Sequence, residues 1–196
     1  MPTPASLPRF DPFNDRTSRD VRNGLSERFV AVLTGTGPEE KLHHAAVALR
    51  RLPLAPVHAA YLDDRMARFA KALGEVPRTS PDDVDAVTRI LWNLGLFFET
   101  HEYLETVWLH SSGPEKEILQ ALIRAAGVYV HLEQGNTRGA RKMADKSLEA
   151  LRCHAPALAC RIGNLDDLLT ALARLSPIAP ELRPAAAPPN PHGTSP

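Results

Sequence analysis

Hydrophobic residues recur every three or four positions along most of the chain, and polar residues fill the positions between them. This spacing places the hydrophobic side chains on one face of an α-helix. The pattern stops at breaks rich in Gly and Pro or Ser, such as residues 34–38 and 111–114. No alternating segment bounded by hairpin turns appears. We therefore predict an all-α fold of about eight helices, arranged as antiparallel hairpins packed in a bundle, with no sheet.

The two ends of the chain lack this periodicity. Residues 1–15 contain four prolines and predict a flexible arm, and the Pro- and Ala-rich residues 177–196 predict a disordered tail. The residues between them, 16–176, are expected to form a single all-α domain. Its predicted parts are added N-terminal helices at 16–76, a helical core at 80–153 and a C-terminal helix at 160–176.

Two local patterns refine these helices. The sequence TSPDD at residues 79–83 predicts a helix start, because it combines a capping hydroxyl, a proline for the first helical position and acids for the positive end of the dipole. In the helix expected at about 57–73, the stripe of Leu62, Met66, Phe69 and Leu73 is predicted to face the core. The charged residues of that helix, Arg65 included, are predicted to point elsewhere.

Composition narrows the functional classes. The 196 residues carry 23 basic and 23 acidic side chains, so no basic surface for nucleic acid is indicated. The first residues lack an apolar segment, and the most apolar interior run is short, so neither export nor a membrane span is expected. We expect a cytoplasmic protein. Cys153 and Cys160 are expected to be reduced thiols.

Candidate chemistry is concentrated on the helix expected at 97–110. Glu99, His101, Glu102 and Glu105 share about half of its circumference at about 100° per residue. Crowded carboxylates ionise together when a cation or a hydrogen-bond donor offsets their repulsion, so Glu102, Glu105 and His101 are candidate catalytic residues or metal ligands. A structural interpretation also applies, because acids in a first helical turn are favoured by the dipole and can face water.

A second polar strip lies on the following helix. Gln120, Arg124 and His131 fall on one side of a segment that is otherwise rich in Ala, Leu, Ile and Val. Buried polar groups need partners, so this strip is expected to face the Glu/His helix, with Arg124 against Glu102 or Glu105. The two strips form either a structural ion-pair network or a ligand site. In the second case Glu99, Gln120, Arg124 and His131 are candidate ligand-binding residues beside the candidate catalytic residues Glu102, Glu105 and His101.

The same segment resembles a known family. The sequences GLFFETHEYLETVW at 95–108, QALI at 120–123, HL at 131–132 and GNTRGA at 135–140 resemble the bacterial and archaeal family called domain of unknown function 309. The resemblance covers about residues 90–151. It implies a small all-α fold with this segment as its core and the Glu/His positions as its signature, but no activity. Arg124 departs from the family's Gln, which favours an ion pair or an anionic ligand over a metal.

Two functional hypotheses follow. In the first, the Glu/His cluster binds a small molecule or a divalent cation, with hydrolysis as the reaction such groups would support. In the second, the chain is a non-enzymatic interaction module resembling a helical repeat, since Gly95 and Gly135 lie forty residues apart in similar turns. The known zinc and di-iron patterns do not fit, so no metal is assigned. Whether the protein is an enzyme stays open.

Overall fold

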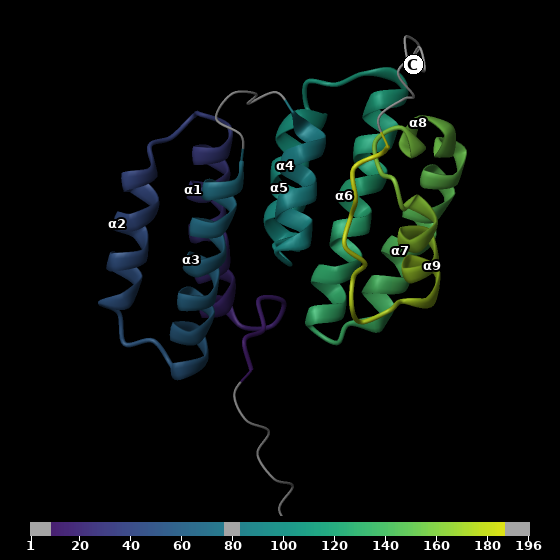
Figure 1. The fold of residues 1–196 in the computed structure, drawn as a ribbon. Coiled ribbons are helices and arrows are strands. Elements are labelled where there is room, and N and C mark those ends of the chain that lie inside the picture. The colour runs from purple at the N-terminus through teal and green to yellow at the C-terminus, as the bar shows by residue number, and fades with distance from the viewer. Residues whose placement is uncertain (1–8, 77–82, 187–196) are drawn as a thin grey trace, which may run out of the picture.

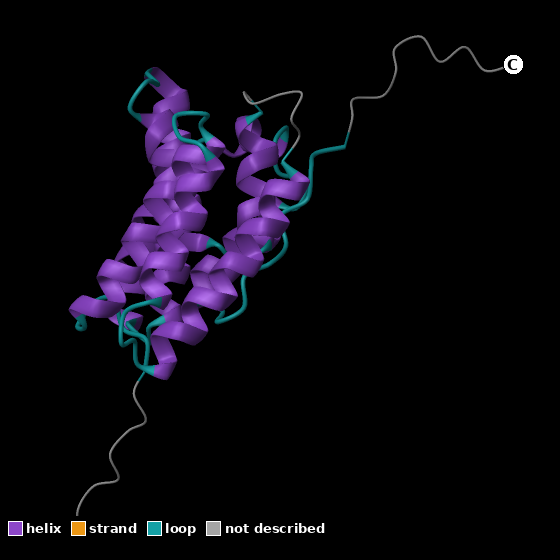
Figure 2. Cartoon of the chain, turned by 90° about the vertical axis from the view of Figure 1, so that its left-hand side faces the viewer, coloured by secondary structure: helices purple, strands orange, loops and turns teal. Residues whose placement is uncertain are grey.

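The computed structural model describes residues 9–76 and 83–186, and within these ranges the chain is helix and loop (Figures 1 and 2). The predicted all-α fold is confirmed. The described part holds no strand, only an isolated bridge between Ile162 and Pro184. None of its helices combines the length and apolar character that a bilayer span requires. The helices are α1 (Arg16–Leu33), α2 (Glu39–Arg50), α3 (Pro56–Glu75), α4 (Val84–Asn93), α5 (Phe97–Trp108), α6 (Gly113–Glu133), α7 (Thr137–Cys153), α8 (Ala155–Ala159) and α9 (Leu165–Arg174).

The helices lie side by side in three neighbouring groups. Figure 1 shows α1 to α3 on one side, α4 to α6 in the middle and α7 to α9 on the other side. The N-terminal group is built around the stacked rings of Phe29 and Phe69, whose centroids are 4.0 Å apart. It joins the middle group through contacts of α1 with α5, and α6 packs between α5 and α7. The three groups share one continuous hydrophobic core. Because α5 packs against both α1 and α6, its polar residues lie near both of these helices.

Glycine ends two of the central helices. Gly95 after α4 and Gly135 after α6 have φ angles of 67° and 65°, a left-handed conformation that residues with a Cβ rarely adopt. Each turn is closed by the same pair of backbone hydrogen bonds, for example from the Gly95 N–H to Trp92 O and from the Leu96 N–H to Leu91 O. These two turns set the starts of α5 and α7. The predicted cap at residues 79–82 lies outside the described residues, and α4 is instead capped by the Asp83 side chain.

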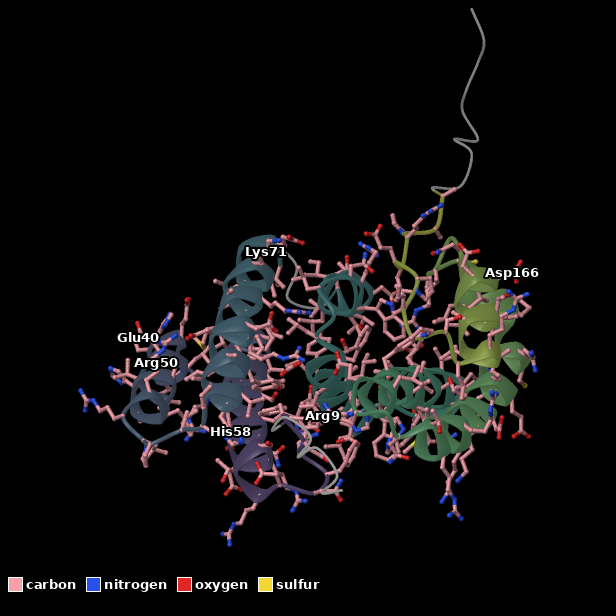
Figure 3. The ribbon with its side chains drawn as sticks, turned by 90° about the horizontal axis from the view of Figure 1, so that it is seen from below. Arg9, Glu40, Arg50, His58, Lys71 and Asp166 are labelled. Atoms are coloured by element: carbon pink, nitrogen blue, oxygen red, sulfur yellow. The ribbon has the colours of Figure 1, made fainter. Side chains whose placement is uncertain are left out.

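Residues 9–15 of the predicted arm pack against the helices. The Phe10 ring stacks on Tyr61 with centroids 3.6 Å apart, and the Phe13 ring stacks on His131 at 4.8 Å. Arg9 donates a hydrogen bond to Glu133 O at the end of α6. Seen from below, Arg9 lies at the junction between the N-terminal helices and the rest of the chain (Figure 3). This part of the arm is therefore a strap across the helix ends.

The predicted disordered tail is corrected for residues 177–186. This segment runs back from α9 and lies against α4, with Leu182 only 4% exposed. The Trp92 indole donates a hydrogen bond to Pro180 O at 2.9 Å. The Asn93 amide donates to Leu182 O at 3.0 Å and accepts from the Leu182 N–H at 2.8 Å. These side-chain hydrogen bonds satisfy backbone groups of the proline-rich segment, which is therefore ordered although it forms neither helix nor sheet.

Candidate functional site

The polar cluster of α5 divides into a buried part and an open part. Glu99 is completely buried, at 0% exposure. His101 and Glu102 are half-buried, and Glu105 is exposed. The division follows from the packing of α5, because its first turn is covered by α1 and α3 whereas the next turn reaches the surface. Glu99 and the other three residues therefore need separate explanations.

Glu99 belongs to a structural ion-pair network. It accepts a hydrogen bond of 2.5 Å from the Ser26 hydroxyl on α1, and its other oxygen lies 3.8 Å from Nη1 of Arg65 on α3. Arg65 is only 7% exposed, and its Nη2 lies 3.9 Å from Glu133 on α6. Although burial alone lowers the pKa of Arg65, the charges of Glu99, Tyr61 and Glu133 raise it overall. This network ties four helices together.

The burial of Arg65 corrects the prediction that it points away from the core. A signal was available in the sequence, because Arg65 lies at helical spacing between Leu62 and Phe69, both of which are buried. The predicted partner of the carboxylates, Arg124, forms no ion pair or hydrogen bond with any described residue. Arg65 therefore takes the structural role that the sequence suggested for Arg124.

The other two residues of the predicted α6 strip also form no hydrogen bond or ion pair with the α5 carboxylates. His131 is covered by the Phe13 ring, and burial lowers its pKa. Its Nδ1 is buried without a hydrogen-bond partner in the described chain. Gln120 is half-buried and forms no hydrogen bond with a described residue. The backbone of α6 nevertheless comes close to the cluster at Gly127, where an added Cβ would lie 3.9 Å from Nδ1 of His101.

His101 is oriented by the backbone of α6. Its Nδ1 lies 3.2 Å from the carbonyl oxygen of Ile123, and its Nε2 lies 3.3 Å from a carboxylate oxygen of Glu105. A carbonyl oxygen and a carboxylate oxygen can both only accept a hydrogen bond, but of these two contacts only the one to Ile123 O has hydrogen-bond geometry, so we assign the proton of neutral His101 to Nδ1. The bare Nε2 then faces a carboxylate oxygen. Two such acceptors repel each other unless a proton or a cation lies between them.

Glu102 completes a set of three possible metal ligands. One donor atom each from His101, Glu102 and Glu105 lie within 4.8 Å of one another, the one such group of three in the described residues. Burial raises the pKa of Glu102, His101 opposes that shift, and the nearby charge of Glu105 adds to it. No Lys or Arg of the described chain lies within ion-pair distance of Glu102 or Glu105. The negative charge of the open part is therefore not offset by a Lys or Arg ion pair in the described chain.

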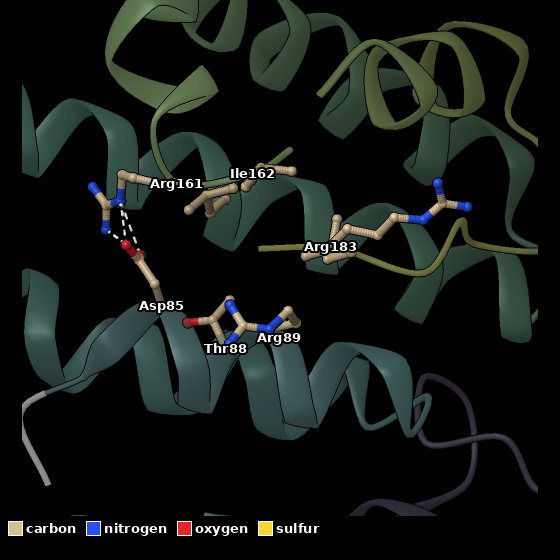
Figure 4. A pocket seen from close by; sticks show the side chains of 8 residues that line it. Asp85, Thr88, Arg89, Arg161, Ile162 and Arg183 are labelled. Atoms are coloured by element: carbon tan, nitrogen blue, oxygen red, sulfur yellow. Dashed lines mark hydrogen bonds and ion pairs between the residues drawn. The ribbon is translucent and has the colours of Figure 1, made fainter. Parts of the chain in front are cut away.

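A small cavity beside α4 is a structural feature. It lies between α4 and the segments around Ile162 and Arg183, and its volume of about 10 Å³ has room for roughly one water molecule. On one side Arg161 forms an ion pair with Asp85 at 2.6 Å, drawn with dashed lines in Figure 4, and another with Glu115 at 2.8 Å. These charges are paired. We do not assign a ligand to this pocket because it is too small.

Comparisons with known proteins identify one segment. Residues 88–143 match the model of the family described as Domain of unknown function (DUF309). The match contains the whole Glu/His cluster and the α6 strip, and it confirms the resemblance predicted for about residues 90–151. It covers less than half of the 196-residue chain. No curated protein and no solved structure matches the chain.

Proposed function

We propose that His101, Glu102 and Glu105 bind a divalent metal ion. The observation that carries the proposal is the contact between His101 Nδ1 and Ile123 O, at 3.2 Å. Histidine ligands in proteins usually donate their second ring N–H to a backbone carbonyl or a carboxylate, which fixes the tautomer and directs the other nitrogen at the metal. Here that other nitrogen is directed at Glu105.

The spacing of the donor atoms supports this site. Ligand atoms around an ion at about 2.0 to 2.2 Å lie about 3 to 4 Å apart, compared with separations of up to 4.8 Å in this cluster. The exposed Glu105 side chain can supply the remaining movement, since 50% of it is open to solvent. A single imidazole with two carboxylates suits Zn²⁺ or Mn²⁺ better than Ca²⁺, which prefers oxygen ligands alone.

The proposed chemistry is hydrolytic. Three protein ligands leave a coordination position for water, and a bound metal lowers the pKa of that water so that it becomes a nucleophile near neutral pH. The ligand roles of Glu99 and Arg124 are dropped from this proposal, because Glu99 accepts a hydrogen bond from Ser26 and Arg124 forms no hydrogen bond or ion pair with the cluster. Gln120 and His131 also take no part. Cytoplasmic location, and the absence of membrane or nucleic-acid partners, remain expectations from the sequence.

Thermal unfolding with added metal tests the site. A ligand at about 100 times its dissociation constant stabilises a protein by about 2.7 kcal/mol, so Zn²⁺ or Mn²⁺ should raise the unfolding temperature by several degrees. His101→Asn should abolish the increase. The matched control is His43→Asn, because His43 Nε2 also lies 3.3 Å from a glutamate, Glu39, at the same spacing on α2. An equal metal response in His101→Asn would exclude the proposed site.

A further inference from the structure

Arg22 on α1 packs on Phe98 of α5, on the helix that carries the proposed metal ligands. Its guanidinium carbon sits 3.8 Å above the centre of the Phe98 ring on α5. Phe98 precedes Glu102 by four residues, so the two side chains are neighbours on the same face of that helix. The positive charge of Arg22 accordingly lowers the pKa of Glu102 and so opposes the rise that burial causes. The N-terminal helices, which lie outside the family match, thus place a cation next to the family's Glu/His positions.

The charge of Arg22 is not balanced by an ion pair. Its Nε and Nη2 donate hydrogen bonds to Oδ1 of Asn23, a neutral group, at 3.1 and 3.0 Å. No carboxylate of a described residue lies within 4.0 Å of the Arg22 guanidinium. Its Nη1 donates no hydrogen bond to any described residue. Burial lowers the pKa of Arg22, while Tyr61, Glu99 and Glu102 oppose that shift. Arginine nevertheless stays charged at neutral pH, so a half-buried donor remains available.

We infer that Arg22 and the metal ion together bind a small oxyanion, a phosphoryl or carboxylate group on the substrate. The inference rests on the proposed metal site. One oxygen of the anion would coordinate the ion, and another would accept a hydrogen bond from Nη1 of Arg22. Guanidinium groups bind such anions well, and the Phe98 face holds this one in position by a cation–π contact.

The alternative role for Arg22 is to offset the charge of Glu102 without binding a ligand. The two roles differ in how the metal ion and an added anion change each other's binding affinity. A ligand that bridges the ion and Arg22 makes each tighten the binding of the other by the same factor. An arginine that only balances charge gives no such coupling. In either role its positive charge weakens cation binding when no anion is present.

The test is a titration of the full chain with Mn²⁺, followed by its electron paramagnetic resonance signal. The titration is carried out under three conditions: without an added anion, with methylphosphonate, and with acetate. The two anions distinguish recognition of a phosphoryl group from recognition of a carboxylate. We expect one of the two anions to tighten Mn²⁺ binding by about fivefold or more. Arg22→Gln should lose this coupling while binding Mn²⁺ alone at least as tightly. The matched control is Arg28→Gln on the same helix, where an exposed arginine donates to Gly24 O.

The results separate this inference from the metal proposal. Mn²⁺ binding that neither anion strengthens would overturn the inference and leave the metal site standing. Equal coupling in the wild type and Arg22→Gln would also overturn it, because the anion would then bind without Arg22. If the wild type binds no Mn²⁺ under any of the three conditions, both proposals fail.

Discussion

The Nδ1 atom of His101 lies 3.2 Å from the carbonyl oxygen of Ile123, one helix away. This contact distinguishes His101 from His43, which faces a glutamate at the same distance of 3.3 Å but has no carbonyl partner among the described residues for its other nitrogen. A side chain fixed in this way keeps its Nε2 in one place. Orientation by α6, rather than the number of acids on α5, therefore marks His101 as a candidate ligand.

The tautomer of His101 can be measured directly. In the metal-free protein at pH 8, nitrogen NMR shifts should show neutral His101 protonated at Nδ1, because Ile123 O accepts that hydrogen bond. Histidines in water mostly carry the proton on the other nitrogen, and His43 serves as the internal comparison. A His101 signal from the Nε2-protonated form would remove the basis for metal ligation through Nε2.

Removing the Glu99 carboxylate should destabilise the fold. Glu99→Ala leaves the buried Arg65 without its closest charge partner, and breaking a buried pair in this way costs about 3 to 5 kcal/mol. Urea unfolding measures the loss. Glu99→Gln, which keeps an acceptor for the Ser26 hydroxyl, should lose less than Glu99→Ala. Equal stability of Glu99→Ala and the wild type would show that the network contributes nothing.

A Cβ at Gly139 would collide with His131. The added atom would lie 2.5 Å from Nδ1 of the ring, which the Phe13 stack holds in place. We expect Gly139→Ala to destabilise the protein by about 1 to 3 kcal/mol. His131→Ala in the same chain should recover most of that loss, which a double-mutant cycle measures. In Gly74→Ala, where nothing lies within 4 Å, the added methyl group should be neutral or stabilising.

Stability should depend on the protonation of Glu133. Burial raises the pKa of Glu133 to about 7, opposed by Arg65, although 37% of the side chain is exposed and water moderates the effect. The folded state then holds this proton more tightly than the unfolded state, so stability falls as pH rises from about 4.5 to 7. Glu133→Gln should flatten that fall in chemical unfolding curves. Exposed Glu149→Gln should not, and an unchanged slope in Glu133→Gln would contradict the assignment.

Local sequence patterns predicted the helices because helical periodicity and breakers act within a few residues. They failed where distant residues decide the structure. The segment at 177–186 has a composition typical of disorder, yet Trp92 and Asn93, 88 and 89 residues away from their partners, supply its hydrogen bonds. Leu175 lies within the C-terminal helix predicted at 160–176, but it ends α9 in a left-handed conformation with φ of 51°.

The candidate site was predictable in its membership but not in its partners. Helical spacing alone brings His101, Glu102 and Glu105 together, because positions three and four apart are neighbours. Spacing does not reveal which helix covers each turn, so Glu99 was grouped with them although α1 and α3 bury it. Arg22 and the Ile123 carbonyl were missed for the same reason, since both come from other helices. The ligand role of the three residues stays a prediction.

Equilibrium dialysis against Zn²⁺ tests metal binding at these residues most directly. The wild type and His43→Asn should each retain about one ion per chain more than Glu102→Gln or Glu105→Gln, because each of the latter lacks one of the three protein ligands. The same zinc content in all four proteins would contradict the proposed metal site.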